Sequence, residues 1–285
     1  MKQLLILTMT ALLVACGGNE PESEPSAPAP EAAAPAPEAA VVAEVTEAVE
    51  EAMDAPQPPA MVEFIWHSKA ENYSDEALMA HTTAWASIPG ASGWELGLAA
   101  VMTPRFESED FDFLWVLAWP TLEARDNAWA DWAENHEAAW LELTSNTFTY
   151  SVDNVYGFSP SPGRMPSAMN TSGTSVAEFL FCAYREGMGD ANRQSFEAMH
   201  SAFMDAYEAE AGPTGYWWTI MSPQFEPQES NMFNYMWTNF FADDSERDTV
   251  YAAYEASEHS SQAEADAECT DPAVFDSRVI YRAGA

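Results

Sequence analysis

The sequence predicts an α+β fold in which two copies of a βαββαβ unit follow a signal peptide and a disordered acidic tether. Three observations support this prediction. The composition changes abruptly near residue 60, strand and helix patterns alternate beyond it, and the motifs of one half recur in order in the other. The predicted divisions are a signal peptide 1–15, a tether 16–60, a first repeat 61–160, a linker 161–175 and a second repeat 176–285.

The N-terminal segment has the features of an export signal. Lys2 is followed by an apolar run from Leu4 to Ala15, which ends directly before Cys16. The run has the length of a signal-peptide core and is shorter than the roughly 20 apolar residues that a membrane-spanning helix requires. The residues LVAC, which end at Cys16, resemble the bacterial lipobox. This resemblance implies cleavage before Cys16 and lipid on its thiol, with an ordinary secreted protein or a short membrane anchor as the alternative.

Lipid on Cys16 would make the membrane a partner of the chain, because several acyl chains bury enough methylene groups for stable attachment. In bacterial lipoproteins, Asp directly after the cysteine is associated with retention in the inner membrane. This chain has Gly17 there. The resemblance therefore implies a protein of the cell envelope, anchored to the outer membrane.

Residues 17–60 are rich in Pro, Ala and Glu, with ten acidic residues and no basic or aromatic ones. Such a segment buries too little apolar surface to offset its ordering entropy, so we predict a disordered tether. A helix over residues 39–53 is the alternative.

The whole chain is acidic, with a formal net charge of -36 and lysines only at Lys2 and Lys69. This charge excludes nucleic acid as a partner, since binding to phosphates requires basic residues. The acidic clusters 107–112 and 243–248 lack the residue spacing of a calcium loop and are predicted to be hydrated surface.

An internal repeat is the most informative feature of the remainder. Residues 63–64 recur as 178–179, and 102–107 as 221–226. The match continues in a series of aromatic residues, in which Phe111, Phe113, Trp115 and Trp119 correspond to Phe233, Tyr235, Trp237 and Phe241. The order is never broken, which indicates a duplicated unit.

Each copy is predicted to run strand, helix, strand, strand, helix, strand. In the first copy these elements are 62–68, 75–88 with Ser74 as N-cap, 94–103, 111–119, a helix from the cap Thr121 to about Leu143, and 147–158. In the second they are 176–184, 191–211, 216–221, 232–241, 244–267 and 273–281. Ser, Pro and Gly in residues 161–175 predict a linker.

This order is the ferredoxin-like pattern, a four-stranded antiparallel sheet with both helices on one face. The strand 111–119 is apolar on both faces, so a second sheet must cover the face that the helices leave open. Two copies in one chain satisfy each other. The product resembles the dimeric α+β barrel superfamily as an intramolecular pseudo-dimer, and a monomer is expected.

The segment TLEARDNAWADWAENHEAAWLEL resembles the NIPSNAP-like branch of that superfamily, in which an Arg and a later Trp flank a similar helix. Relatives in the superfamily include monooxygenases and haem-degrading enzymes. The resemblance therefore implies a ligand pocket more readily than a particular reaction.

Histidines recur between the copies. His81 and His200 match in the first helix, and His136 and His259 match within one residue in the second. They are interpreted as structural hydrogen-bonding groups, with a metal or haem ligand as the alternative. No pair has metal-site spacing, so no metal or cofactor is predicted.

Glu63 and Glu178 lie in apolar strands. A solvated strand end or a salt bridge to an arginine is the first interpretation, and a general base with a raised pKa is the other. Cys182 lies late in the first strand of the second repeat and Cys269 lies just before its last strand. These strands are expected to be antiparallel neighbours, so a disulfide is predicted, with a buried free Cys182 as the alternative.

Two functions remain open. The first is a binding module whose cavity takes a small apolar or cationic ligand against tryptophans, for which the candidates are Trp85, Trp115, Trp129, Trp132 and Trp237. Core packing is the other interpretation of these residues. The second function is an enzyme of the monooxygenase or isomerase kind, with a histidine or Glu63 or Glu178 as base. The sequence contains no complete catalytic motif, which favours the binding module.

Overall fold

A computed structural model of the chain describes residues 59–284 except 228–231. The predicted signal peptide, Cys16 and almost all of the tether lie outside the described residues. No helix in the described part is long and apolar enough to cross a membrane.

The described chain contains the two predicted repeats. The first consists of β1 (Met61–Lys69), α2 (Asp75–Trp85), α3 (Ser87–Ser92), β2 (Leu98–Pro104), β3 (Phe113–Trp119), α4 (Leu122–Asp131), the π-helix η1 (Trp132–His136), α5 (Glu137–Thr144) and β4 (Phe148–Arg164). The second consists of β5 (Thr174–Tyr184), α6 (Asp190–Ala211), β6 (Trp217–Pro223), β7 (Tyr235–Phe241), α7 (Asp244–Glu255), α8 (His259–Asp266), β8 (Ala267–Cys269) and β9 (Ala273–Arg282). The predicted caps Ser74 and Thr121 accept hydrogen bonds from Ala77 and Ala124 backbone amides.

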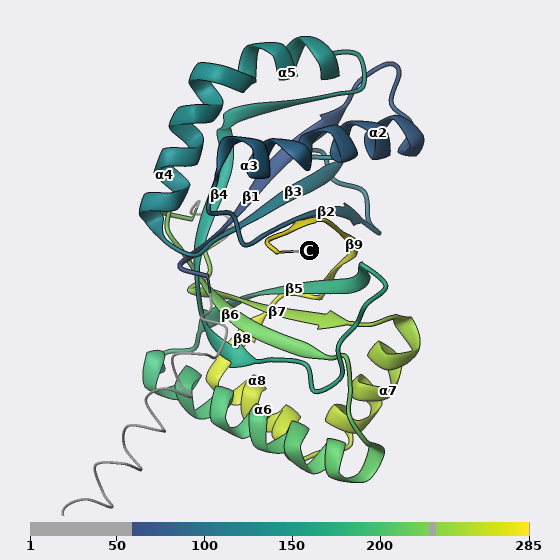
Figure 1. Cartoon of the computed structure of the whole chain (residues 1–285). Helices are drawn as coiled ribbons and strands as arrows, with labels where there is room; N and C mark the ends of the chain where they lie inside the picture. The colour runs from purple at the N-terminus through teal and green to yellow at the C-terminus, as the bar shows by residue number, and fades with distance from the viewer. Residues whose placement is uncertain (1–58, 228–231, 285) are drawn as a thin grey trace, which may run out of the picture. The chain divides into compact units, whose positions relative to one another are not determined.

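The strands form a closed antiparallel barrel. The order is β4-β1-β3-β2 in the first repeat and β9-β5-β7-β6 in the second. The two sheets join edge to edge, because β2 pairs with β9 and β4 pairs with β6. The helices of each repeat lie on the outer side of its own sheet (Figure 1). The predicted architecture, an intramolecular α+β barrel of two βαββαβ repeats, is confirmed by this strand order.

Each sheet is buried on both faces, as the sequence predicted. On β3, Phe113, Trp115 and Trp119 belong to the core under the helices of the first repeat. The alternate residues Leu114 and Val116 belong to a separate core that fills the barrel between the two sheets. A third core lies under the helices of the second repeat.

The second helix of the first repeat is not the single α-helix that the sequence predicted. It is α-helical to Asp131, π-helical from Trp132 to His136 and α-helical again from Glu137. Trp132 and Trp140 are eight positions apart, whereas two α-helical turns take about seven residues. The π-helix absorbs the additional residue, so that both indoles face the core, with 6.0 Å between their ring centroids.

The predicted linker 161–175 is partly wrong, because β4 continues to Arg164. Ser161 and Arg164 pair with Ile220 and Trp218 of β6, across an irregularity in register. A bulge tolerates proline within a strand. Gly163 is required for this approach, because a Cβ atom there would lie 1.9 Å from the Trp218 carbonyl oxygen. Ser, Pro and Gly therefore belong to a strand here.

Two predicted helices are also divided. The segment 75–88 ends as α2 at Trp85 and is followed by the short helix α3, whereas 244–267 is divided into α7 and α8. In both, the α-helix is interrupted between the two pieces, which a helical periodicity alone does not reveal.

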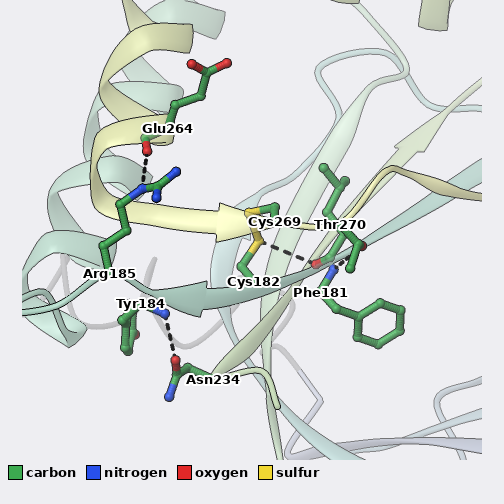
Figure 2. The surroundings of a disulfide bond; sticks show 9 residues. Phe181, Cys182, Tyr184, Arg185, Asn234, Glu264, Cys269 and Thr270 are labelled. Atoms are coloured by element: carbon green, nitrogen blue, oxygen red, sulfur yellow. Dashed lines mark hydrogen bonds between the residues drawn. A yellow bond between two sulfur atoms is a disulfide. The ribbon is translucent and has the colours of Figure 1, made fainter. Parts of the chain in front are cut away.

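A disulfide joins Cys182 of β5 to Cys269 of β8 (Figure 2). The two residues lie directly opposite each other in the antiparallel pair. The Thr270 backbone amide donates to the Phe181 carbonyl at 3.0 Å, and Arg185 Nε donates to the Glu264 carbonyl at 2.7 Å. The disulfide and these hydrogen bonds therefore fix the short strand β8 to β5, the first strand of the second repeat.

Candidate functional site

A pocket lies between the helices and the sheet of the first repeat. Its volume is about 40 Å³ and it is partly open to solvent. One water molecule needs roughly 10–15 Å³ by the same measure, so the pocket can hold a small ligand. Seven tryptophans line it, namely Trp85, Trp94, Trp115, Trp119, Trp129, Trp132 and Trp140. The chain has 11 tryptophans, so most of them lie around this one space.

Four of the five tryptophans that the sequence singled out are brought together here, namely Trp85, Trp115, Trp129 and Trp132. The fifth, Trp237, lies away from this pocket in the core of the second repeat, where its ring centroid is 4.8 Å from that of Phe196.

The sequence interpretation missed Trp94, Trp119 and Trp140, together with His67 and Tyr150. Trp119 shares a strand face with Trp115, so strand alternation could have found it. Trp140 could not be placed, because the π-helix determines the direction in which its side chain points.

Glu63 anchors two of the lining indoles. Its carboxylate is almost completely buried, with 1% exposed. Oε2 accepts hydrogen bonds from Trp119 Nε1 at 2.7 Å and Trp129 Nε1 at 2.9 Å. Oε1 accepts from Arg125 Nε at 2.7 Å. The salt-bridge interpretation of Glu63 is therefore the one that the structure shows, and no lone pair is presented to the pocket as a free base.

The remaining hydrogen-bonded indoles are fixed in a similar way. Trp94 Nε1 donates to Asp131 Oδ2 at 2.8 Å, a bond that contributes most to lowering the pKa of Asp131. Trp132 Nε1 donates to the Tyr150 hydroxyl at 2.9 Å, which donates in turn to Glu137 at 3.1 Å. Burial raises the pKa of Tyr150 to about 12. These bonds hold the ring planes in place.

His67 lines the pocket and has one ring nitrogen with an assigned hydrogen bond. Nδ1 lies 3.0 Å from the Ile65 carbonyl oxygen, which can only accept, so Nδ1 carries the proton. The ring stacks on Phe113 with 4.8 Å between centroids. Burial lowers the pKa of His67 to about 4. The imidazole is therefore neutral near pH 7, and Nε2 is an acceptor.

The second repeat has a counterpart of the Glu63 network. Glu178 is fully buried and accepts hydrogen bonds from Arg247 and, at 2.5 Å, from the Tyr251 hydroxyl. Glu63 pairs with Leu117 and Glu178 pairs with Asn239 in the sheets, which makes the two carboxylates equivalent.

The space under the helices of the second repeat is filled differently. Leu117 pairs with Ala99 of β2, whereas the equivalent Asn239 pairs with Trp218 of β6. Trp218 is 1% exposed and contacts His200, with 5.2 Å between ring centroids. An indole thus occupies in the second repeat the position at which the first repeat has only a methyl group.

Two of the recurring histidines, His81 and His200, make structural hydrogen bonds. His81 Nε2 lies 3.1 Å from Thr147 Oγ1, and His200 Nε2 lies 2.8 Å from the Tyr216 hydroxyl, which donates to Asn239. Neither histidine lines the pocket. Within the described residues, no three His, Cys, Asp or Glu side chains are grouped so as to hold a metal ion.

No protein-family model matches the chain, and no curated protein matches it. Solved structures do match. A proposed monooxygenase from Lactobacillus acidophilus NCFM matches at 12% identity over 79% of this chain and 95% of that chain, with a TM-score of 0.49.

A variant of chlorite dismutase from Candidatus Nitrospira defluvii matches at 7% identity over 79% and 94% of the two chains, with a TM-score of 0.49. A heme-binding protein from Thermus thermophilus matches at 13% identity over 78% and 92%, with a TM-score of 0.44. At these identities the similarity concerns the fold, which the closed strand order already establishes.

Haem, which one of these proteins binds, does not fit the pocket described above. A volume of about 40 Å³ is far too small for an iron porphyrin. His200, the buried histidine of α6, is surrounded by the rings of Phe196, Phe203, Trp218 and Trp237. The arrangement of this chain is suited to enclosing a small ligand between aromatic rings.

Proposed function

We propose that the first repeat is a binding module for a small apolar or cationic molecule, which enters the tryptophan-lined pocket. The observation that carries the proposal is the convergence of seven tryptophans on one space. Ligand pockets are typically lined by aromatic side chains and contain few polar groups, and His67 and Tyr150 are the polar members here.

The difference between the repeats supports this proposal. Both repeats have the same order of elements and the same buried Glu–Arg pair. The second repeat fills the space under its helices with Trp218, so the fold does not require a hollow there. The pocket is therefore a feature of the first repeat's own side chains.

The π-helix is a second supporting feature. It contributes Trp132 to the pocket and sets the direction of Trp140. π-Helical turns are rare and occur frequently at functional sites. In a straight α-helix of the same sequence the two side chains would point about 80° apart around the helix axis.

We further propose that lipid on Cys16 holds this module at the outer membrane, through the tether. The support is the lipobox-like sequence, Gly17 after the cysteine, and the acidic, proline-rich composition of residues 17–60. Radioactive palmitate fed to cells that express the chain should label the protein and appear in the outer-membrane fraction. A chain that stays unlabelled, or a Cys16→Ser variant that still carries label, would contradict the anchor.

An enzyme of the monooxygenase or isomerase kind is the alternative, and His67 is the observation that favours it. Its neutral imidazole has an acceptor nitrogen and lines the pocket. Glu63 and Glu178 are unsuitable as bases, because arginines and indole or phenol donors occupy them. If the alternative is correct, incubation with a compound that binds should yield a product, with a changed mass for a monooxygenase or a changed chromatographic retention at the same mass for an isomerase.

The binding module can be tested by filling the pocket. Ala128 lines it, and its counterpart in the second repeat is the larger Val250. Ala130, on the same helix, is exposed and provides a matched control. We would titrate the full chain with benzene as a neutral probe and choline as a cationic probe, and follow tryptophan fluorescence.

At least one probe should change the emission of the wild type and of Ala130→Val, and neither should change that of Ala128→Val. If neither probe binds the wild type, or if Ala128→Val binds equally well, the proposed binding site is wrong.

A further inference from the structure

The lining indoles form the walls of a box. The ring planes of Trp85 and Trp115 meet at 72° with 5.2 Å between centroids. Trp115 and Trp140 meet at 85°, and Trp132 and Trp140 at 66°. Rings at such angles present their faces to an enclosed guest from several sides. The face of an aromatic ring carries the negative part of its quadrupole, so it attracts cations.

Several indole N–H groups donate to carboxylates behind the walls. Trp119 and Trp129 donate to Glu63, and Trp94 donates to Asp131. A hydrogen bond to an anion increases the electron density of the donor ring, because the N–H bond becomes more polarised. The faces of these rings are thereby made more attractive to positive charge.

The charges around the pocket also favour a positively charged ligand. No Lys or Arg lines it. Arg125 lies behind the wall, with its guanidinium carbon 5.9 Å from the centroid of Trp129, and its charge is paired with Glu63. Asp131 and Glu137 accept hydrogen bonds from Trp94 and from Tyr150. The surroundings are therefore net negative.

Most of the N–H donors around this pocket are not available to an anion. Four of the indole N–H groups and His67 Nδ1 already donate to protein acceptors. A bare ammonium or metal ion meets no carboxylate in the space and only neutral acceptors such as His67 Nε2. Losing the water of a strongly hydrated ion without replacing its hydrogen bonds is unfavourable. Methyl groups on the nitrogen spread the charge and match apolar walls.

We infer that the pocket takes a small methylated ammonium group, such as trimethylammonium, by cation–π contact with the tryptophan box. This inference rests on the proposed binding function and names the class of ligand. The net charge of -36 on the chain supports it, because an acidic protein attracts cations at long range.

The test compares choline with its uncharged isostere, in which a tert-butyl group replaces the trimethylammonium group. The two have nearly the same shape, so a difference in affinity reports the charge. Isothermal titration would use the full chain as wild type, Ala128→Val and Ala130→Val. Ethanolamine, which lacks the methyl groups, is the third probe.

We expect choline to bind the wild type and Ala130→Val at least about tenfold more tightly than either the isostere or ethanolamine. Ala128→Val should lose this binding. Equal or tighter binding of the isostere would overturn the inference and leave a pocket for apolar ligands. Choline that fails to bind while benzene still binds would overturn it as well. If all of the probes fail, the proposed binding function falls together with the inference.

Discussion

Glu63 and Glu178 occupy equivalent positions in the two repeats, and each carboxylate accepts a hydrogen bond from an arginine of the second helix of its repeat. Glu63 is 1% exposed and Glu178 is 0% exposed. Arg125 binds the first and Arg247 the second. Since the pair persists in the second repeat, none of whose residues lines the pocket described above, its role is structural.

Replacing either carboxylate should destabilise the fold. Glu63→Gln leaves Arg125 with only the exposed Asp126 as counter-charge and gives two indole donors a weaker acceptor, so we expect a loss of about 2–4 kcal/mol in the free energy of unfolding. Glu178→Gln should behave alike. Urea unfolding measures the change, with Glu123→Gln, exposed on α4, as the control. A loss no larger than that of the control would show that the buried pair is not a structural anchor.

The π-helix predicts an unusual tolerance to deletion. Removing the exposed Ala133 should convert η1 to an α-helix and leave Trp132 and Trp140 on the same face, at a change of less than about 1 kcal/mol. Removing the exposed Ala202 from the uninterrupted helix α6 should instead rotate Phe203 and Met204 by about 100° relative to the preceding turns. Thermal unfolding compares the two deletions. Equal damage from both would contradict the role assigned to η1.

Stability should fall in acid because of two buried histidines. Burial lowers the pKa of His67 to about 4 and that of His200 to about 3, whereas an unfolded histidine has a pKa of about 6.5. Below about pH 6.5 the unfolded chain therefore binds protons that the folded chain does not, and stability decreases as the pH falls. Each histidine should contribute on the order of 3 kcal/mol by about pH 4.

His67→Gln and His200→Gln isolate these contributions, because the carboxylates that titrate in the same range are common to all variants. Urea unfolding between about pH 7 and about pH 5 should show a shallower dependence on pH in each variant, by about 0.7 proton on average. An unchanged slope in both would mean that these imidazoles are not held neutral by burial.

Reduction of the disulfide should destabilise the second repeat. Cys182 and Cys269 are 87 positions apart, and a cross-link that closes a long loop restricts the unfolded chain, so its loss should cost about 2–4 kcal/mol. Thermal unfolding with and without dithiothreitol measures the change. A Cys182→Ser and Cys269→Ser double variant that does not respond to the reductant is the control. Two free thiols in the untreated protein, found by mass spectrometry, would refute the bond.

The fold could be predicted from the sequence because the recurrence of motifs and the periodicity of apolar residues in strands can both be read directly from the order of residues. The two-sided apolar pattern around Trp115 specified that a second sheet covers the first. The extent of β4 could not be predicted, since Pro160 and Gly163 resemble loop residues until the partner strand is known.

The site was predictable in part. Four of the lining tryptophans were expected from their strand or helix faces, but the pocket itself depends on tertiary packing. The first repeat has the small Ala99 where the second has the large Trp218, and its π-helix turns Trp140 inward. Neither a missing volume nor a change of helical pitch leaves a signal in composition or periodicity.

Anomalous diffraction from crystals held under xenon pressure tests the central claim most directly, since xenon enters apolar cavities without needing a specific partner. The account predicts xenon among the indoles of the first repeat and none beneath α6 of the second. An empty first repeat, or xenon in both repeats, would contradict it.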